Sequence, residues 1–194
     1  MAYFFTDRRI GQNREKLQKE VGERKLLFMK QTHSDIVEVV DKNWTIKECD
    51  AMITIDKDVA LCVVVADCIP VVLEDKLKRV VGVAHAGRVG SYKNIIAKTI
   101  EKMKKEFGCK KDDIEIVFGP SIKKCCYEVG EEVTKGYEEF VSVVHDKFFL
   151  DLVALNSKGL KALHVEPICT CCNQDYFSYR RDGTKERFCG VVYV

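Results

Sequence analysis

The chain has few prolines, no long apolar run and no sign of a linker. Only three prolines occur among its 194 residues, and no repeat or low-complexity tract divides the sequence, so we predict a single domain over residues 1–194. The longest apolar run, near residues 59–65, is too short to cross a bilayer, and no membrane partner is expected. The N-terminal residues lack the apolar core and cleavage site of a signal peptide, which predicts a cytoplasmic protein.

An excess of charge of one sign is also missing. The 32 basic and 30 acidic residues leave a formal net charge of +2, which excludes the broad basic face of a nucleic-acid-binding protein. Hydrophobic residues make up 46% of the chain, enough to fill one core. In a reducing compartment the ten cysteines are expected to be thiols or metal ligands and not a disulfide framework.

Apolar residues recur at helical spacing most clearly between residues 91 and 108. Ser91 is expected to cap the start of this helix, and Gly108 suits the left-handed position at its end. Further helices are predicted over residues 13–21, 129–140 and 151–163.

Runs rich in β-branched residues predict strands over residues 26–29, 36–40, 60–65, 71–73, 80–83, 114–118 and 190–194. Several of these runs are apolar without alternation, which indicates burial on both faces of a sheet. The predicted class is therefore α/β with covered sheets. The irregular order of strands and helices does not suit a simple βαβ repeat.

Two histidines and one cysteine follow the ends of apolar strand-like runs: His33, Cys68 and His85. A strand end holds a side chain rigidly and leaves it open to solvent. Two imidazoles and a thiolate are ligands that zinc prefers, and three protein ligands leave a position for water or substrate. We therefore predict that these residues are metal ligands and catalytic residues of a zinc site. In the rival interpretation Cys68 is a nucleophile activated by one histidine, which leaves the second histidine without a role.

Eight short segments recur in order along the chain: 31–33 (Gln-Thr-His), 50–54 (Asp-Ala-Met-Ile-Thr), 66–70 (Ala-Asp-Cys-Ile-Pro), 84–87 (Ala-His-Ala-Gly), 119–122 (Gly-Pro-Ser-Ile), 125–130 (Cys-Cys-Tyr-Glu-Val-Gly), 169–170 (Cys-Thr) and 177–183 (Phe-Ser-Tyr-Arg-Arg-Asp-Gly). This set resembles the laccase-domain family of purine nucleoside phosphorylases, also called polyphenol oxidase or peptidoglycan-editing-factor proteins. The resemblance covers nearly the whole chain.

The resemblance implies both a fold and an activity. The fold is one of mixed β-sheets packed together with helices outside, a four-layer α/β/β/α arrangement. The activity is zinc-dependent phosphorolysis of a purine nucleoside, namely adenosine, inosine, guanosine or methylthioadenosine, with phosphate as the second substrate. Hydrolytic deamination of adenosine at the same site stays open, as do the base preference and the oligomeric state.

Six residues are predicted to bind substrate: Arg14, Gln31, Gly87, Arg88, Arg180 and Arg181. The role of Arg14 is implied by the resemblance, because the family also has Asn-Arg near the N-terminus. Gly87 and Arg88 lie in a turn whose free N–H groups could bind phosphate, although a simple tight turn explains the glycines equally well. The family usually has Trp-Arg where this chain has Arg88 and Val89. The pair Arg180 and Arg181, beside aromatic residues, could stack on a base or hold phosphate, or could instead form structural ion pairs.

Two alternative functions remain open. The first is a copper-dependent, laccase-like polyphenol oxidase, because copper binds such ligands more tightly than zinc and could occupy the same site. The four histidines of the chain are too few for the several copper ions of a laccase. The second is a peptidoglycan-precursor editing or binding protein, since an open metal site could also hydrolyse an amide.

Four further cysteines could form a second zinc site: Cys125, Cys126, Cys169 and Cys172. Cys169 and Cys172 have the Cys-x-x-Cys spacing of zinc ligands. Adjacent cysteines rarely ligate one ion comfortably, however, and we expect these residues to be packing thiols.

Overall fold

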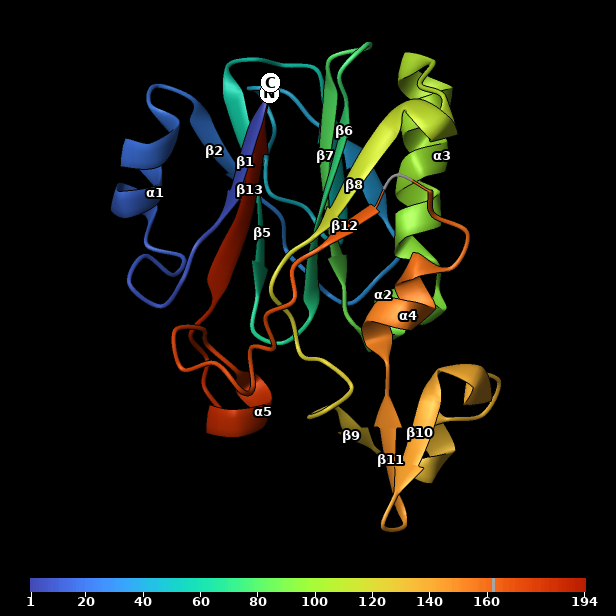
Figure 1. Ribbon diagram of the computed structural model, residues 1–194. Helices are drawn as coiled ribbons and strands as arrows, with labels where there is room; N and C mark the ends of the chain where they lie inside the picture. Colours follow the sequence, from blue (N-terminus) through green and yellow to red (C-terminus); the bar gives the residue numbers. More distant parts are fainter. Residues whose placement is uncertain (162) are drawn as a thin grey trace.

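Two β-sheets pack face to face in the computed structural model, which describes residues 1–161 and 163–194 (Figure 1). The first sheet has the strand order β1-β13-β5-β2. Its strands are β1 (Ala2–Phe5), β13 (Phe188–Tyr193), β5 (Val59–Val65) and β2 (Lys25–Phe28).

The second sheet has the order β12-β8-β6-β7-β4-β3. Its strands are β12 (Leu163–Val165), β8 (Ile114–Phe118), β6 (Ile69–Asp75), β7 (Val80–Ala86), β4 (Ala51–Thr54) and β3 (Val37–Val39). Parallel and antiparallel pairs occur in both large sheets, so both are mixed.

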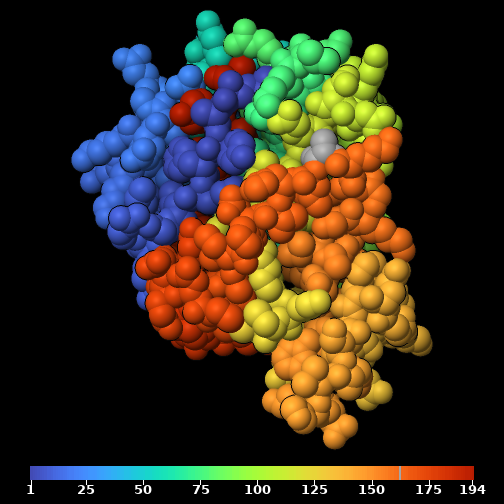
Figure 2. Space-filling model, viewed as in Figure 1, coloured from blue at the N-terminus to red at the C-terminus, as the bar shows by residue number. Residues whose placement is uncertain are grey.

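A small third sheet projects from one end of this sandwich, as the orange segment in Figure 2 shows. It consists of β10 (Val141–Val144), β11 (Lys147–Leu150) and β9 (Glu128–Val129). The α-helices of the described residues are α1 (Arg14–Val21), α2 (Arg88–Tyr92), α3 (Ile95–Phe107), α4 (Leu152–Ser157) and α5 (Tyr179–Asp182). Short 3-10 helices are η1 (Lys111–Asp113), η2 (Glu131–Val133) and η3 (Glu138–Phe140).

Strand β5 shows why its sequence does not alternate between apolar and polar residues. Leu61 and Val63 point into the core between the two large sheets, whereas Ala60 and Cys62 pack under helix α1. Successive side chains of a strand point to opposite faces, so a strand that is covered on both faces needs apolar residues at every position. On the other side, α3 covers the second sheet (Figure 1). The four-layer α/β/β/α arrangement expected from the resemblance is confirmed.

Helix α3 ends as predicted and begins later than predicted. Gly108 adopts the left-handed conformation at its C-terminus, with φ of 66°. Ser91 does not cap α3, because it lies inside the short helix α2, where its Oγ donates a hydrogen bond to the Gly87 carbonyl. Asn94, with φ of 59°, separates the two helices. The start of α3 therefore moves to Ile95.

Two of the other predicted helices need correction. Residues 13–21 form α1 with Asn13 as its N-cap, as expected. Residues 129–140 are not an α-helix: they contain β9, η2 and η3, and Gly136 at φ of 85° lies outside helical geometry. Of residues 151–163, only Leu152–Ser157 are helical, residue 162 lies outside the described residues, and Leu163 begins β12.

All seven predicted strand segments overlap strands of the structure. The sequence patterns missed β1, β4, β9, β10, β11 and β12. All six are two to four residues long, too short for a periodicity to stand out. Among the described residues, no helix has the length and apolar character that crossing a bilayer requires.

The core between the two large sheets can be tested by truncating Leu61, which is fully buried there. We expect Leu61→Ala to lower the free energy of unfolding by about 2 to 5 kcal/mol, because it removes buried methyl groups and leaves a cavity. Urea denaturation measures this change. Leu77→Ala is the control, since Leu77 is 78% exposed. Equal stability of the two variants would contradict the assignment of this core.

Candidate metal centre and cavity

Three side chains from different elements meet at one end of the two-sheet core. His33 follows β2, Cys68 lies in the turn between β5 and β6, and His85 is near the end of β7. One ligand atom from each lies within 4.8 Å of the others, and the rings of His33 and His85 are 4.7 Å apart, centroid to centroid. The structure thus brings together the three ligands predicted from the sequence.

Asp50 holds two of these ligands in place. Its carboxylate accepts hydrogen bonds from the backbone N–H groups of Thr32, His33 and Ser34, and from the Ser34 hydroxyl. His85 Nδ1 lies 2.7 Å from Asp50 Oδ1. A histidine whose Nδ1–H donates a hydrogen bond to a carboxylate presents Nε2 to a metal. Asp50 therefore fixes both the turn that carries His33 and the tautomer of His85.

Hydrogen bonds shift the pKa values of Cys68, His85 and Asp50. Burial alone would raise the pKa of the Cys68 thiol, but hydrogen bonds with His33 and His85 outweigh it and bring the pKa to about 6. Burial would lower the pKa of His85, but its hydrogen bonds with Asp50 and Cys68 raise it to about 9. Despite its burial, Asp50 has a pKa held well below its usual range by bonds from His85 and Ser34. Cys68 is consequently poised as a thiolate.

Gly87 makes room for the ligands. A Cβ atom at this position would lie 2.9 Å from both Cys68 Sγ and His33 Cδ2, closer than van der Waals contact allows. Any larger residue would displace one of the two ligands. Gly87 is therefore needed for close packing around the centre, and its extended backbone does not itself require glycine.

The donor set fits a zinc or copper ion. Two imidazoles and a thiolate suit both metals, and His33 is exposed while His85 is buried. One side of the group therefore faces solvent. Three ligands with an open side are typical of catalytic metal sites and not of structural ones.

A cavity of about 760 Å³ opens on this side of the centre. A volume of this size accommodates a small organic ligand with an accompanying anion. The walls combine the ligands with aromatic, cationic and backbone groups: His33, Cys68, His85, Gln31, Arg88, Tyr127, Glu128, Tyr179, Arg180 and Arg187 are among the lining residues.

Three arginines give the cavity a positive wall. The guanidinium of Arg88 lies 5.9 Å from the ring of Tyr92, and that of Arg180 lies 5.3 Å from the ring of Tyr127. Arg187 donates to the carbonyls of Thr184 and Glu186. Within residues 1–161 and 163–194, none of these three arginines forms an ion pair with a carboxylate. Without a direct ion pair, their guanidinium groups are available to an anionic ligand.

Three of the residues implied to bind substrate are engaged elsewhere. The Arg14 guanidinium lies over the ring of Phe28, 4.7 Å from its centroid, and does not line the cavity. Arg181 donates to the carbonyls of Thr170, Cys171, Asn173 and Tyr176, and thus braces a loop behind the wall. Gln31 lines the cavity but pairs both amide atoms with the backbone of Val64. By contrast, Arg88 and Arg180 do reach the cavity.

Sequence reasoning missed the parts that Asp50, Tyr179 and Arg187 play. Asp50 stands in one of the eight motifs, and a lone acidic residue before a strand gives no sign of its partners. Tyr179 is adjacent to the predicted arginine pair, and 61% of it is exposed at the cavity. For Arg187, the sequence offers no signal beyond the basic stretch in which it lies.

Comparisons with known proteins identify related sequences. The family model described as "Multi-copper polyphenol oxidoreductase laccase" matches residues 6–194. A Clostridium acetobutylicum protein named as a purine nucleoside phosphorylase is 42% identical over 177 residues, which cover 85% of this chain and 72% of that protein. An Aquifex aeolicus protein with the same name is 37% identical over 192 residues, 96% of this chain and 91% of that protein.

Solved structures share the fold. The hypothetical protein YfiH of Bacillus licheniformis superposes with a TM-score of 0.85 at 25% identity, over 94% of this chain and 80% of that one. A Neisseria meningitidis protein gives a TM-score of 0.83 at 29% identity, over 94% and 79% of the two chains. Fold and site define a mixed α/β protein with an open metal-ligand group. The chain belongs to the multi-copper polyphenol oxidoreductase laccase family.

Asp50→Asn should weaken zinc binding about 10- to 100-fold, the usual effect of removing a carboxylate that orients a histidine ligand. Asparagine keeps the shape of the side chain and loses the charge that fixes the His85 tautomer. Competition with a chelator of known affinity measures the change. Asp35→Asn is the control, because Asp35 pairs with Lys98 on the surface. An affinity equal to wild type would remove Asp50 from this role.

Proposed function

We propose that this protein is a zinc-dependent purine nucleoside phosphorylase that acts on adenosine, inosine, guanosine or methylthioadenosine. The observation that carries the proposal is the open His33, Cys68 and His85 group at the floor of a cavity with unpaired arginines. The names of the Clostridium and Aquifex relatives support the same reaction class. A cytoplasmic location is part of the proposal and remains a prediction from the sequence.

Phosphate is best placed against Arg88 and Arg180. Both guanidiniums line the cavity, both rest near an aromatic ring, and neither is neutralised by a carboxylate within the described part of the chain. The Nη1 of Arg180 donates hydrogen bonds to the carbonyls of Cys126 and Glu128. These bonds orient the remaining N–H groups of the guanidinium. Charge-assisted hydrogen bonds from such groups bind a phosphate strongly and directionally.

The nucleoside base has aromatic neighbours in the same cavity. Tyr179 presents an exposed ring, on which a purine can stack. Burial, and then the charge of Cys68, raise the pKa of Tyr127, so its phenol stays neutral and can donate a hydrogen bond. In phosphorolysis the bond from the sugar to the base nitrogen breaks, a phosphate oxygen bonds to the sugar, and the departing base gains the proton that the phosphate loses.

A zinc ion bound by His33, Cys68 and His85 would supply Lewis-acid polarisation of the substrate. The protein itself positions phosphate through its arginines and shields the reacting bond from bulk water within the cavity. Adenosine deamination at the same centre is a second reaction that such polarisation would allow.

The family description favours testing phenol oxidation as a second candidate. Copper could bind the same three ligands. A multi-copper mechanism, however, needs several copper sites rich in histidine, and the chain has four histidines. Two of them, His145 and His164, are exposed and lie outside the group. No specific feature of the cavity's described lining residues points to binding or hydrolysis of peptidoglycan precursors.

One assay distinguishes these functions. Zinc-loaded enzyme is incubated with adenosine or inosine, with and without phosphate, and products are resolved by chromatography. We expect free base and ribose 1-phosphate only when phosphate is present. His85→Ala should abolish the reaction, because a lost ligand removes the fixed geometry of the centre. Oxygen consumption with phenols by copper-loaded protein, in the absence of any nucleoside reaction, would replace the purine proposal with the oxidase one.

Arg88→Ala should raise the KM for phosphate roughly 10- to 100-fold, the loss expected for a charged hydrogen bond of about 1.5 to 3 kcal/mol. Steady-state kinetics with varied phosphate measures this. Arg9→Ala is the control, because Arg9 is exposed and pairs with Asp7. Arg14→Ala tests the resemblance against the cavity geometry. A comparable rise in the phosphate KM of this variant would favour the resemblance, because Arg14 does not line the cavity.

A further inference from the structure

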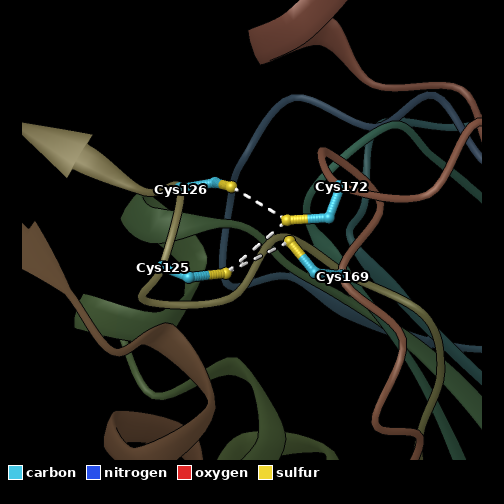
Figure 3. Close-up of side chains that lie close together, drawn as sticks. All are labelled: Cys125, Cys126, Cys169 and Cys172. Atoms are coloured by element: carbon cyan, nitrogen blue, oxygen red, sulfur yellow. Dashed lines mark hydrogen bonds between the residues drawn. The ribbon is translucent and has the colours of Figure 1, made fainter.

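Four cysteines converge outside the centre described above. Cys125 and Cys126 follow β8, and Cys169 and Cys172 lie in the loop after β12; Figure 3 shows all four thiols pointing toward one another. Their sulfur atoms lie within 4.8 Å of each other. Three of these separations are 3.7 Å for Cys125 to Cys169, 3.8 Å for Cys125 to Cys172 and 3.3 Å for Cys126 to Cys172.

These separations match a tetrahedral metal site. With Zn–S bonds of ~2.3 Å, the edge of the sulfur tetrahedron is ~3.8 Å. Two of the measured distances agree with that edge within 0.1 Å, and the third needs a small expansion. A disulfide would bring two sulfurs to ~2.0 Å, and all four cysteines are free thiols.

The turn around residues 123–127 removes the objection to adjacent cysteines as ligands. The N–H groups of Cys126 and Tyr127 both donate to the carbonyl of Lys123, which curls the chain so that Cys125 and Cys126 face the same way (Figure 3). The opposite loop is closed by the Asn173 N–H, which donates to the Cys169 carbonyl. Each loop thus presents a pair of sulfurs.

A backbone donor is aimed at this cluster. The Lys123 N–H lies 3.4 Å from Cys169 Sγ, and an N–H donor of this kind stabilises a thiolate. The isolated bridge between Ser121 and Cys169 holds the two loops in register. The sulfurs are therefore preorganised by backbone contacts and do not depend on a disulfide.

We propose that Cys125, Cys126, Cys169 and Cys172 bind one structural zinc ion. Four soft thiolates in tetrahedral arrangement select zinc or iron, and four protein ligands leave no open position for chemistry. This site differs in kind from the group of His33, Cys68 and His85, which has three ligands and an open side.

The consequence lies in the cavity wall. One clamped loop continues into Tyr127 and Glu128, and the other leads to Tyr179 and Arg180, all of which line the cavity. Arg180 already links the two loops through the Cys126 and Glu128 carbonyls. A metal at the four cysteines would lock the two halves of this wall together.

The test needs no change to the four cysteines. In His33→Ala/Cys68→Ala, only the proposed site keeps its ligands, and we expect about one zinc per chain by elemental analysis. X-ray absorption at the zinc edge should show four sulfur neighbours at ~2.3 Å. Nitrogen or oxygen neighbours, or an absence of zinc together with a Cys126–Cys172 disulfide in mass spectra, would overturn the proposal. Iron in place of zinc would overturn the metal assignment.

Further substitutions locate the ligands. Adding Cys169→Ser/Cys172→Ser to that background should remove the remaining zinc and speed hydrogen exchange at the amides of residues 123–130 and 178–181. Cys171→Ser is the matched control in the same loop, because Cys171 lies outside the four-sulfur group, and it should retain the zinc. Loss of zinc in the control with retention in the double variant would refute this ligand set. None of these readouts depends on nucleoside turnover.

Discussion

A buried carboxylate organises the candidate metal centre. Asp50 has no exposed surface, and an ionised side chain at such a position is tolerated only when its oxygens are hydrogen-bonded. Three consecutive backbone N–H groups, one hydroxyl and one imidazole meet this requirement. The turn they form holds His33 at φ of 59°, a conformation that non-glycine residues rarely adopt. The geometry of the ligands therefore depends on the charge of one aspartate.

The three candidate ligands could be picked out from the sequence because they follow or lie near strand ends, and the structure brings them together. An apolar run followed by His33 or Cys68 is a local pattern, and the end of a buried strand leaves few orientations for the next side chain. The partners of Asp50 are not local, since they come from segments 16 to 35 residues away. Only the pairing of β4 with β7, which places Ala51 opposite Ala84, brings Asp50 to His85. A single sequence does not encode that register in any readable motif.

The same distinction explains the successes and errors in the fold. The apolar run of β5 and the left-handed Gly108 are set by local composition, and both were predicted. Residues 129–140 have the composition of a helix, but tertiary contacts decide their structure. Tyr137 stacks on Tyr92 with ring centroids 3.7 Å apart, and β9 pairs with β11. These tertiary contacts stabilise an irregular conformation of residues 129–140 and override their weak helical preference.

Two sulfur-containing sites with different ligand numbers imply two different tasks. The His33, Cys68 and His85 group is incomplete as a coordination sphere and faces a cavity, so its open side is available to a substrate. The four-cysteine cluster offers four protein ligands, which would leave no open position on the proposed zinc ion. Its loops carry Tyr127 and Arg180 into the same cavity that the first group floors. A substrate bound by Tyr127 and Arg180 must stay at a fixed distance from a metal bound by His33, Cys68 and His85. Small misplacements of reacting groups slow a reaction strongly. The proposed four-cysteine site would meet this requirement by holding rigid the loops that carry Tyr127 and Arg180. The sequence alone suggested that these cysteines only pack.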